Sequence, residues 1–236
     1  MTKSLRLLSS ALLVAAAVAL PLAASAVSSF VVTGGQLSTV QFVDATGAPV
    51  PCPIGSTANC LVAPVAIGAG TLTLDTTGGQ LLDLGFGLSG TGSVVMGGVN
   101  GLSTVDFFAT AYQSSGAVAL SALGGGNFNF GPMPGTVTTS VTFNPLAGPS
   151  VGVSGTSFAS APSGTIFTSL STANLSLIGV DLGQVCDPLN PQNCLFVKAD
   201  FNLIAAAIPE PSAALVFGIG ALVVGAGTRR SGRTSA

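Results

Sequence analysis

Short extended segments separated by turn-forming residues constrain the fold of this chain more than any other feature. Runs of β-branched and aromatic residues recur roughly every ten residues, with Gly, Pro, Asn and Ser between them. Residues 136–143 and 174–180 also alternate apolar and polar side chains, which is typical of strands with one buried face. Residues 27–208 contain no apolar stripe of helical period bounded by helix caps. The pattern therefore predicts an all-β body, folded as an antiparallel β-sandwich or a jelly-roll-like structure.

The same pattern predicts where the strands lie. They are expected at residues 30–32, 39–43, 71–74, 81–88, 93–99, 104–112, 118–123, 136–143, 151–158, 165–170, 175–182 and 195–204. The pentapeptide at residues 33–37 recurs at 77–81, and we expect both copies to be a turn that leads into a strand. Residues 85–90 match G-x-G-x-x-G. In a dinucleotide-binding fold a helix begins after this motif, whereas here the motif is followed by residues typical of a strand. We therefore expect residues 85–90 to form another turn.

The four cysteines form two closely spaced pairs, Cys52 with Cys60 and Cys186 with Cys194. Each pair encloses seven residues rich in Pro, Asn or Ser. Four cysteines allow three pairings, and in an exported protein the local one is expected. One disulfide would then close a surface loop, and the other would bracket a hairpin loop between the last two strands. A Cys₄ zinc site is the alternative, but it usually has more closely spaced cysteines.

The N-terminal residues follow the three-part pattern of a secretory signal peptide. Lys3 and Arg6 precede an uncharged apolar run, and Ala24 and Ala26 form an A-x-A-like cleavage site. The apolar run is too short to span a bilayer comfortably. We therefore expect signal peptidase to remove residues 1–26.

The C-terminal residues combine a proline-rich motif, an uncharged apolar stretch and a basic cluster. The motif is Pro209-Glu210-Pro211-Ser212, and the basic cluster is Arg229, Arg230 and Arg233. The apolar stretch between them has about 17 residues, the lower limit for a membrane-spanning helix. By the positive-inside rule, the arginines would hold the C-terminus in the cytoplasm and leave the body outside.

These C-terminal residues resemble the PEP-CTERM sorting tail, whose parts occur here in the family's order over residues 208–233. The resemblance implies that an exosortase in the inner membrane of a Gram-negative bacterium recognises the motif. It also implies anchoring in that membrane before processing, and later a place at the cell surface or outside the cell, in contact with exopolysaccharide. An ordinary C-terminal anchor with a proline-rich stalk is the alternative. The expected organisation is a signal peptide at 1–26, an extracellular domain at 27–207 and a sorting tail at 208–233.

The charge of the body argues against nucleic acid as a partner. Residues 27–208 contain seven aspartates and one lysine, which gives a net charge of −6. Such a surface repels phosphate and offers it no basic patch. The chain also contains no histidine, which removes Ser-His-Asp and Cys-His catalysis together with the commonest metal ligand. We therefore expect no catalytic residue, no metal ligand and no cofactor.

Lys198 is the only ammonium group in the body, and it lies in an alternating segment that ends in Asp200. We expect it to be a solvent-facing strand charge beside Asp200 rather than the base of a Ser-Lys dyad. The sequence as a whole predicts an exported, non-enzymatic protein. Its expected role is that of a structural or interaction component of the exopolysaccharide or biofilm matrix.

Two other functions stay open. A glycan- or calcium-binding module would need a cluster of aspartates or a concave face near Tyr112 and Phe128. A glycoside hydrolase would need two aspartates at the catalytic separation. Glycan recognition often uses Trp or Tyr, yet the chain has no Trp and one Tyr. We expect the Phe side chains of residues 128–130 to pack in the core rather than lie exposed on a loop.

Overall fold

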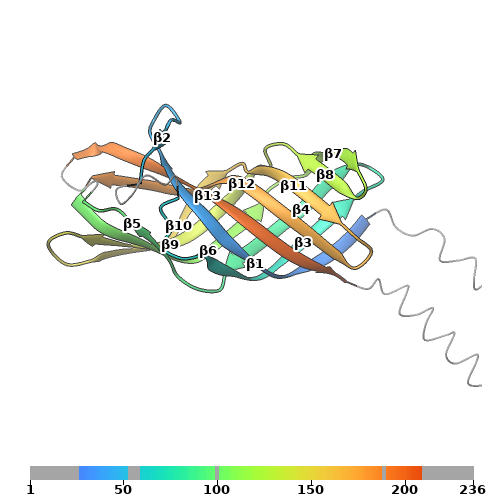
Figure 1. Cartoon of the computed structure of the whole chain (residues 1–236), viewed down its shortest axis with the longest axis horizontal. Helices are drawn as coiled ribbons and strands as arrows, with labels where there is room; N and C mark the ends of the chain where they lie inside the picture. Colours follow the sequence, from blue (N-terminus) through green and yellow to red (C-terminus); the bar gives the residue numbers. More distant parts are fainter. Residues whose placement is uncertain (1–26, 53–58, 99–100, 188–189, 209–236) are drawn as a thin grey trace, which may run out of the picture. The chain divides into compact units, whose positions relative to one another are not determined.

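The computed structural model describes residues 27–52, 59–98, 101–187 and 190–208 (Figure 1). These ranges fold into antiparallel β-strands and contain no α-helix, so the predicted all-β class and antiparallel pairing are confirmed. The strands are β1 (Val27–Val43), β2 (Pro49–Val50), β3 (Val65–Asp75), β4 (Gln80–Leu88), β5 (Gly92–Val95), β6 (Leu102–Ser114), β7 (Val118–Gly124), β8 (Asn127–Phe130), β9 (Gly135–Pro145), β10 (Val151–Ser160), β11 (Ser163–Thr168), β12 (Thr172–Asp187) and β13 (Asn190–Ala207).

All of these strands belong to one sheet. Its order is β10-β9-β6-β4-β3-β1-β13-β12-β11-β8-β7, with β2 paired to β1 and β5 paired to β6. A further pairing joins β4 to β7, where Gln80 lies opposite Ala119 and Leu81 opposite Val118. Since β4 and β7 stand far apart in the strand order, this pairing closes the sheet on itself between them.

The hydrophobic core lies between facing parts of this curved sheet. The rings of Phe86 on β4 and Phe201 on β13 have centroids 5.0 Å apart, although β3 and β1 separate these strands in the sheet order. Both side chains are buried, and Phe86 also contacts the ring of Tyr112. Figure 1 shows β11, β12 and β13 passing in front of β3 and β4. Strands distant in the sheet order therefore share one apolar interior, which their inward side chains fill.

Both predicted disulfides are present. The Sγ atoms of Cys52 and Cys60 are bonded, and so are those of Cys186 and Cys194. Cys186 lies opposite Cys194 on β12 and β13, so this bond brackets the hairpin between the last two strands, as predicted. Cys52 and Cys60 are both buried, and their bond links the ends of the segment 53–58, which lies outside the described residues.

The prediction of a turn at residues 33–37 is wrong. These residues lie inside β1, which bulges between Val32 and Gly34 and continues along β13. Gly35 has a φ of 129°, and a Cβ atom there would collide with the carbonyl oxygen of Asn202. The glycine is needed because the neighbouring strand comes so close. A local sequence pattern does not show that approach.

The second copy of the pentapeptide does form the predicted turn. The Asp75 carboxylate accepts hydrogen bonds from the backbone N–H groups of Thr77 and Gly78, at 3.1 and 2.7 Å, and β4 begins at Gln80. The turn predicted at residues 85–90 is limited to residues 89–90, however, where the chain bends after the end of β4. Residues 85–88 belong to β4, and a Cβ at Gly85 would collide with the Gln113 side chain of β6. As at residues 33–37, glycine is needed here because a neighbouring strand lies close, and not because the chain turns.

The prediction for residues 128–130 is confirmed for Phe130, which is buried. The segment itself is a strand, β8, which pairs with β7 on one side and β11 on the other. Its neighbouring turn has three successive glycines with positive φ, from Gly124 to Gly126. A Cβ at Gly126 would collide with the carbonyl oxygen of Thr168, so the turn brings β8 beside β11 only if glycine stands there.

Candidate functional site

The residues predicted to direct export and sorting lie outside the described part of the chain. They are Ala24, Ala26, Pro209, Glu210, Pro211, Ser212, Arg229, Arg230 and Arg233. The transmembrane helix expected before the arginines lies there too. Among the described residues no helix has the length and apolar character needed to cross a bilayer. The roles of all these residues stay predictions.

Two of the aspartates stabilise turns. Asp44 follows β1, and its carboxylate accepts hydrogen bonds from the Thr46 hydroxyl and from the N–H groups of Ala48 and Thr46. These bonds favour the charged carboxylate and lower the pKa of Asp44, the Thr46 hydroxyl having the largest effect. Asp75 stabilises the turn before β4 by accepting hydrogen bonds from the backbone N–H groups of Thr77 and Gly78. Both carboxylates therefore have a structural use.

Two further aspartates connect neighbouring strands. Asp83 accepts hydrogen bonds from Gln113 and Ser114, at 2.8 and 2.9 Å. Asp106 accepts them from Ser93 and Asn144, at 2.5 and 2.8 Å. The described residues contain no group of three or more His, Cys, Asp or Glu side chains that could hold a metal ion. The aspartate cluster that a calcium site would require is thus not formed in these ranges.

Lys198 forms an ion pair with Asp181, 2.9 Å away, rather than with Asp200. The antiparallel register places Asp181 on β12 directly opposite Lys198 on β13. Asp200 instead accepts a hydrogen bond from the backbone N–H of Gly179, at 2.9 Å. The predicted strand charge is correct, but its partner across the strands could be known only from the register.

Tyr112 belongs to the core and not to a concave surface. Its side chain is 2% exposed, and its hydroxyl donates a hydrogen bond to the Met133 carbonyl at 2.9 Å. Burial disfavours the phenolate and raises the pKa of Tyr112 to about 12. The concave face considered near Tyr112 and Phe128 therefore does not form at Tyr112.

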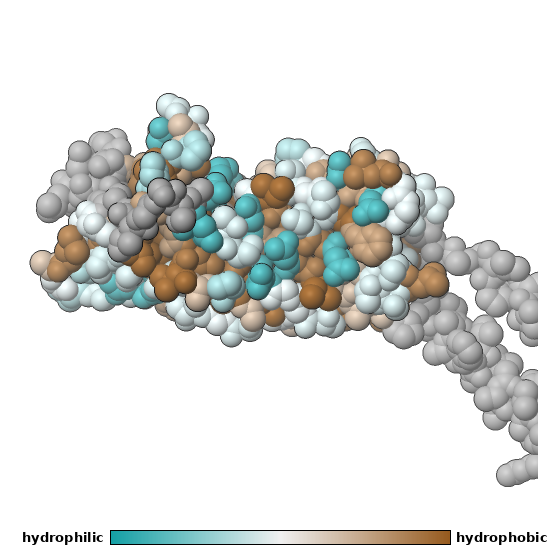
Figure 2. Space-filling view, in the orientation of Figure 1, coloured by the Kyte–Doolittle hydropathy of each residue, from teal (hydrophilic) through white to brown (hydrophobic). Residues whose placement is uncertain are grey.

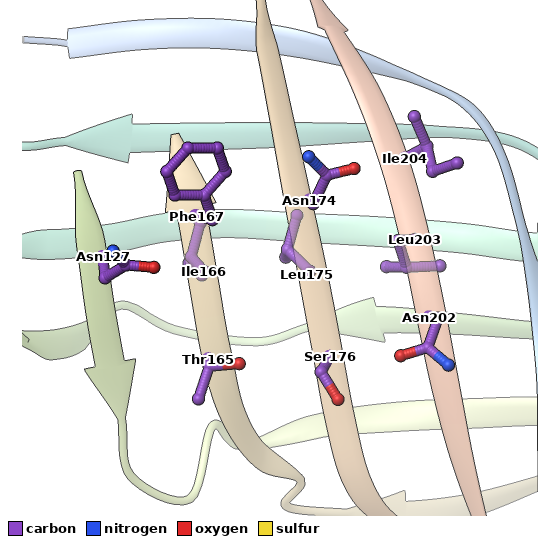
Figure 3. Close-up of a pocket in the computed structure, with 10 residues that line it drawn as sticks. All are labelled: Asn127, Thr165, Ile166, Phe167, Asn174, Leu175, Ser176, Asn202, Leu203 and Ile204. Carbon is purple, nitrogen blue, oxygen red and sulfur yellow. The ribbon is translucent and has the colours of Figure 1, made fainter. Parts of the chain in front are cut away.

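A shallow groove instead crosses the outer face of β8, β11, β12 and β13, with a volume of about 270 Å³ (Figure 3). Two rows of outward side chains, one residue from each strand in register, border it. The first row contains Asn127, Phe167, Asn174 and Ile204. The second row contains Thr165, Ser176 and Asn202. Between the rows lie Ile166, Leu175 and Leu203, whose side chains are buried on the other side of the sheet.

The groove offers polar groups without any charged residue in its lining. Within the described residues, the side chains of Thr165, Ser176 and Asn174 have no hydrogen-bond partner. Asn127 donates from its amide nitrogen to the Gly124 carbonyl at 3.2 Å, which leaves its oxygen as an acceptor. Both donors and acceptors thus face solvent along the groove.

Two apolar side chains complete the first row. The ring of Phe167 is 43% exposed, and Ile204 is 50% exposed. Asn127 and Asn174 flank Phe167 on the neighbouring strands. Figure 2 shows hydrophilic residues interspersed with smaller hydrophobic areas on the face that carries β11, β12 and β13. The exposed ring therefore lies among amides rather than in a continuous apolar patch.

Sequence reasoning missed this groove. The alternation at residues 174–180 does place Asn174 and Ser176 on one face, and that prediction is confirmed by their exposure relative to Leu175 and Leu177. The outward position of Phe167 beside Asn174 depends on how β11 pairs with β12.

Comparison with family models, curated proteins and solved structures finds no match to this chain.

Proposed function

We propose that this chain is an exported, non-enzymatic protein that joins the exopolysaccharide or biofilm matrix after sorting through its C-terminal tail. The observation that carries the proposal is the pair of local disulfides, Cys52–Cys60 and Cys186–Cys194. Disulfides persist in oxidising compartments outside the cytoplasm. This agrees with the signal-peptide pattern at residues 1–26 and the sorting motif at Pro209-Glu210-Pro211.

A non-enzymatic role is supported by what the reactive groups do in the fold. The chain has no histidine, and each of its four cysteines is in a disulfide. Lys198 is paired with Asp181, and Asp44, Asp75, Asp83 and Asp106 have structural hydrogen bonds. A catalytic acid or nucleophile needs a neighbouring group that activates it. The contacts of these side chains instead stabilise turns or connect neighbouring strands.

The sorting proposal is tested by mass spectrometry of the protein from the culture medium and cell envelope of its host. We expect the mature chain to begin near Val27 and to end near residues 209–211. In a strain without the sorting enzyme, Arg229 to Ala236 should stay attached. The same should hold for Glu210→Ala in the complete strain, because the charged residue between the two prolines is removed.

Lys198→Met is the matched control, since it also removes one charge but lies in the body. Its processing should equal that of the wild type. If Arg229 to Ala236 stay attached in every strain, the tail is a plain membrane anchor and the link to exopolysaccharide is lost.

A further inference from the structure

We propose that the groove across β8, β11, β12 and β13 binds an extended, neutral polysaccharide chain. This inference rests on the proposed function in one respect, which is that an extracellular location brings the groove into contact with polysaccharide. The site itself follows from the side chains that line the groove and from their register.

The polar side chains of the groove match the chemistry of a sugar. Sugar hydroxyls donate and accept hydrogen bonds, so a complementary surface needs both kinds of group. Asn174 offers both through its amide, Thr165 and Ser176 offer hydroxyls, and Asn127 keeps its oxygen available. These residues stand on paired strands, which hold their backbones in fixed positions before a ligand arrives.

Phe167 supplies the apolar part of the contact. One face of a pyranose ring carries mainly C–H groups, which pack favourably on the face of an aromatic ring. Phe167 is 43% exposed and stands in register with Asn127 and Asn174. A saccharide ring that lies on Phe167 would therefore have amide groups at both of its edges (Figure 3).

The second row of polar side chains extends past both ends of the groove. Asn129 on β8 lies opposite Thr165, and Gln36 on β1 lies opposite Asn202. Both are exposed, so uncharged polar residues from five neighbouring strands form one line: Asn129, Thr165, Ser176, Asn202 and Gln36. At the usual strand spacing this line is about 19 Å long. Such a length suits a chain of several sugars better than a single one.

Other classes of ligand fit the groove less well. A peptide strand binds a sheet through an unpaired edge, whereas β8, β11, β12 and β13 each have a strand on both sides. The groove lining contains no cation, and the ammonium of Lys198 is paired with Asp181. With seven aspartates in the body, nucleic acids and acidic polysaccharides would be repelled. These points favour a neutral chain.

The test is affinity electrophoresis of the full chain in native gels that contain a soluble polysaccharide. The full chain includes the apolar C-terminal stretch, so the gels contain a detergent. This detergent must lack a sugar headgroup, since such a headgroup would compete for the site. Galactomannan, hydroxyethylcellulose and dextran are the neutral probes, and alginate is the acidic one. We expect at least one neutral polymer to retard the protein and alginate to leave its mobility unchanged. Phe167→Ala should weaken binding at least about fivefold, and Asn174→Ala at least about threefold.

Two variants serve as matched controls. Phe196→Ala removes an aromatic ring of similar exposure, 39%, from β13 away from the groove. Gln184→Ala removes an exposed amide from β12, opposite Phe196. Both should retain the affinity of the wild type within about twofold. Equal losses in Phe167→Ala and Phe196→Ala would contradict the site.

Retardation by none of the neutral polymers would overturn the proposal, and retardation by alginate would overturn the neutral class. The sorting experiment fails or succeeds separately. A protein that keeps its tail and still binds galactomannan through Phe167 would remove the sorting proposal and leave the binding site standing.

Discussion

The ring of Phe158 on β10 lies against the backbone of Gly183 on β12, so that a Cβ atom at Gly183 would be 2.6 Å from two ring carbons. Two residues along β10, the Ser160 hydroxyl accepts a hydrogen bond from the Asp181 N–H at 2.9 Å. These contacts join β10, at one end of the strand order, to β12.

Gly183→Ala should destabilise the protein by about 2 kcal/mol or more, because Gly183 has a φ of 120° and the added methyl would displace the Phe158 ring. Urea unfolding followed by circular dichroism measures the loss. Gly152→Ala on β10 is the control, since the nearest atom to its Cβ would be at an ordinary 3.8 Å. Its stability should change by less than about 0.5 kcal/mol. Equal stability of the two variants would contradict the packing of Phe158 on Gly183.

Replacing both cysteines of a disulfide by alanine should cost about 2.5 kcal/mol through the entropy of a loop of this length. The pair Cys52 and Cys60 should cost more than the pair Cys186 and Cys194, because Cys52 and Cys60 are 7% and 5% exposed and belong to the core. Urea unfolding of the two double variants compares the losses. A larger loss for the Cys186–Cys194 pair would be inconsistent with these burial positions.

Tyr112 should ionise with a midpoint of about 12 in the folded protein. The chain has one Tyr and no Trp, so ultraviolet absorbance follows this phenol alone. In denaturant the midpoint should return to about 10. The folded pKa is the higher one, so the stabilising contribution is complete below about pH 10 and is lost as pH rises towards 12. A midpoint near 10 in the folded protein would place Tyr112 at the surface.

Tyr112→Phe should cost about 1 to 2 kcal/mol, because the Met133 carbonyl loses its hydrogen-bond donor inside the protein. Thermal unfolding of the variant gives this value.

The ion pair between Lys198 and Asp181 should contribute little to stability. Their side chains are 40% and 34% exposed, so water screens the attraction. A double-mutant cycle with Lys198→Met and Asp181→Asn should give a coupling energy below about 1 kcal/mol, and added salt should reduce it further. A coupling of several kcal/mol would instead indicate a pair isolated from solvent.

Period-two alternation and turn residues were sufficient to predict the strand class and most strand positions. The pattern placed strands inside β4, β6, β9 and β12. The alternation predicted at residues 136–143 and 174–180 matches the alternating burial of residues 135–139 in β9 and 173–177 in β12. The pattern failed where glycine serves a neighbouring strand. Gly35 follows Gly34, and Gly87 lies two residues after Gly85, so both segments resemble turns in the sequence. Each glycine nevertheless lies within a strand, Gly35 beside Asn202 and Gly85 beside Gln113. Such contacts join residues distant in sequence.

The sequence by itself determined the all-β class, the two disulfide pairs and the outward faces of Asn174 and Ser176, because these depend on residues only a few positions apart. Only the tertiary structure decided that Phe167 stands beside Asn174, that Lys198 pairs with Asp181, and that Tyr112 is buried against Phe86. Strand order and register set these contacts. Alternation specifies which face of a strand is buried, but it does not specify which strand lies next to it.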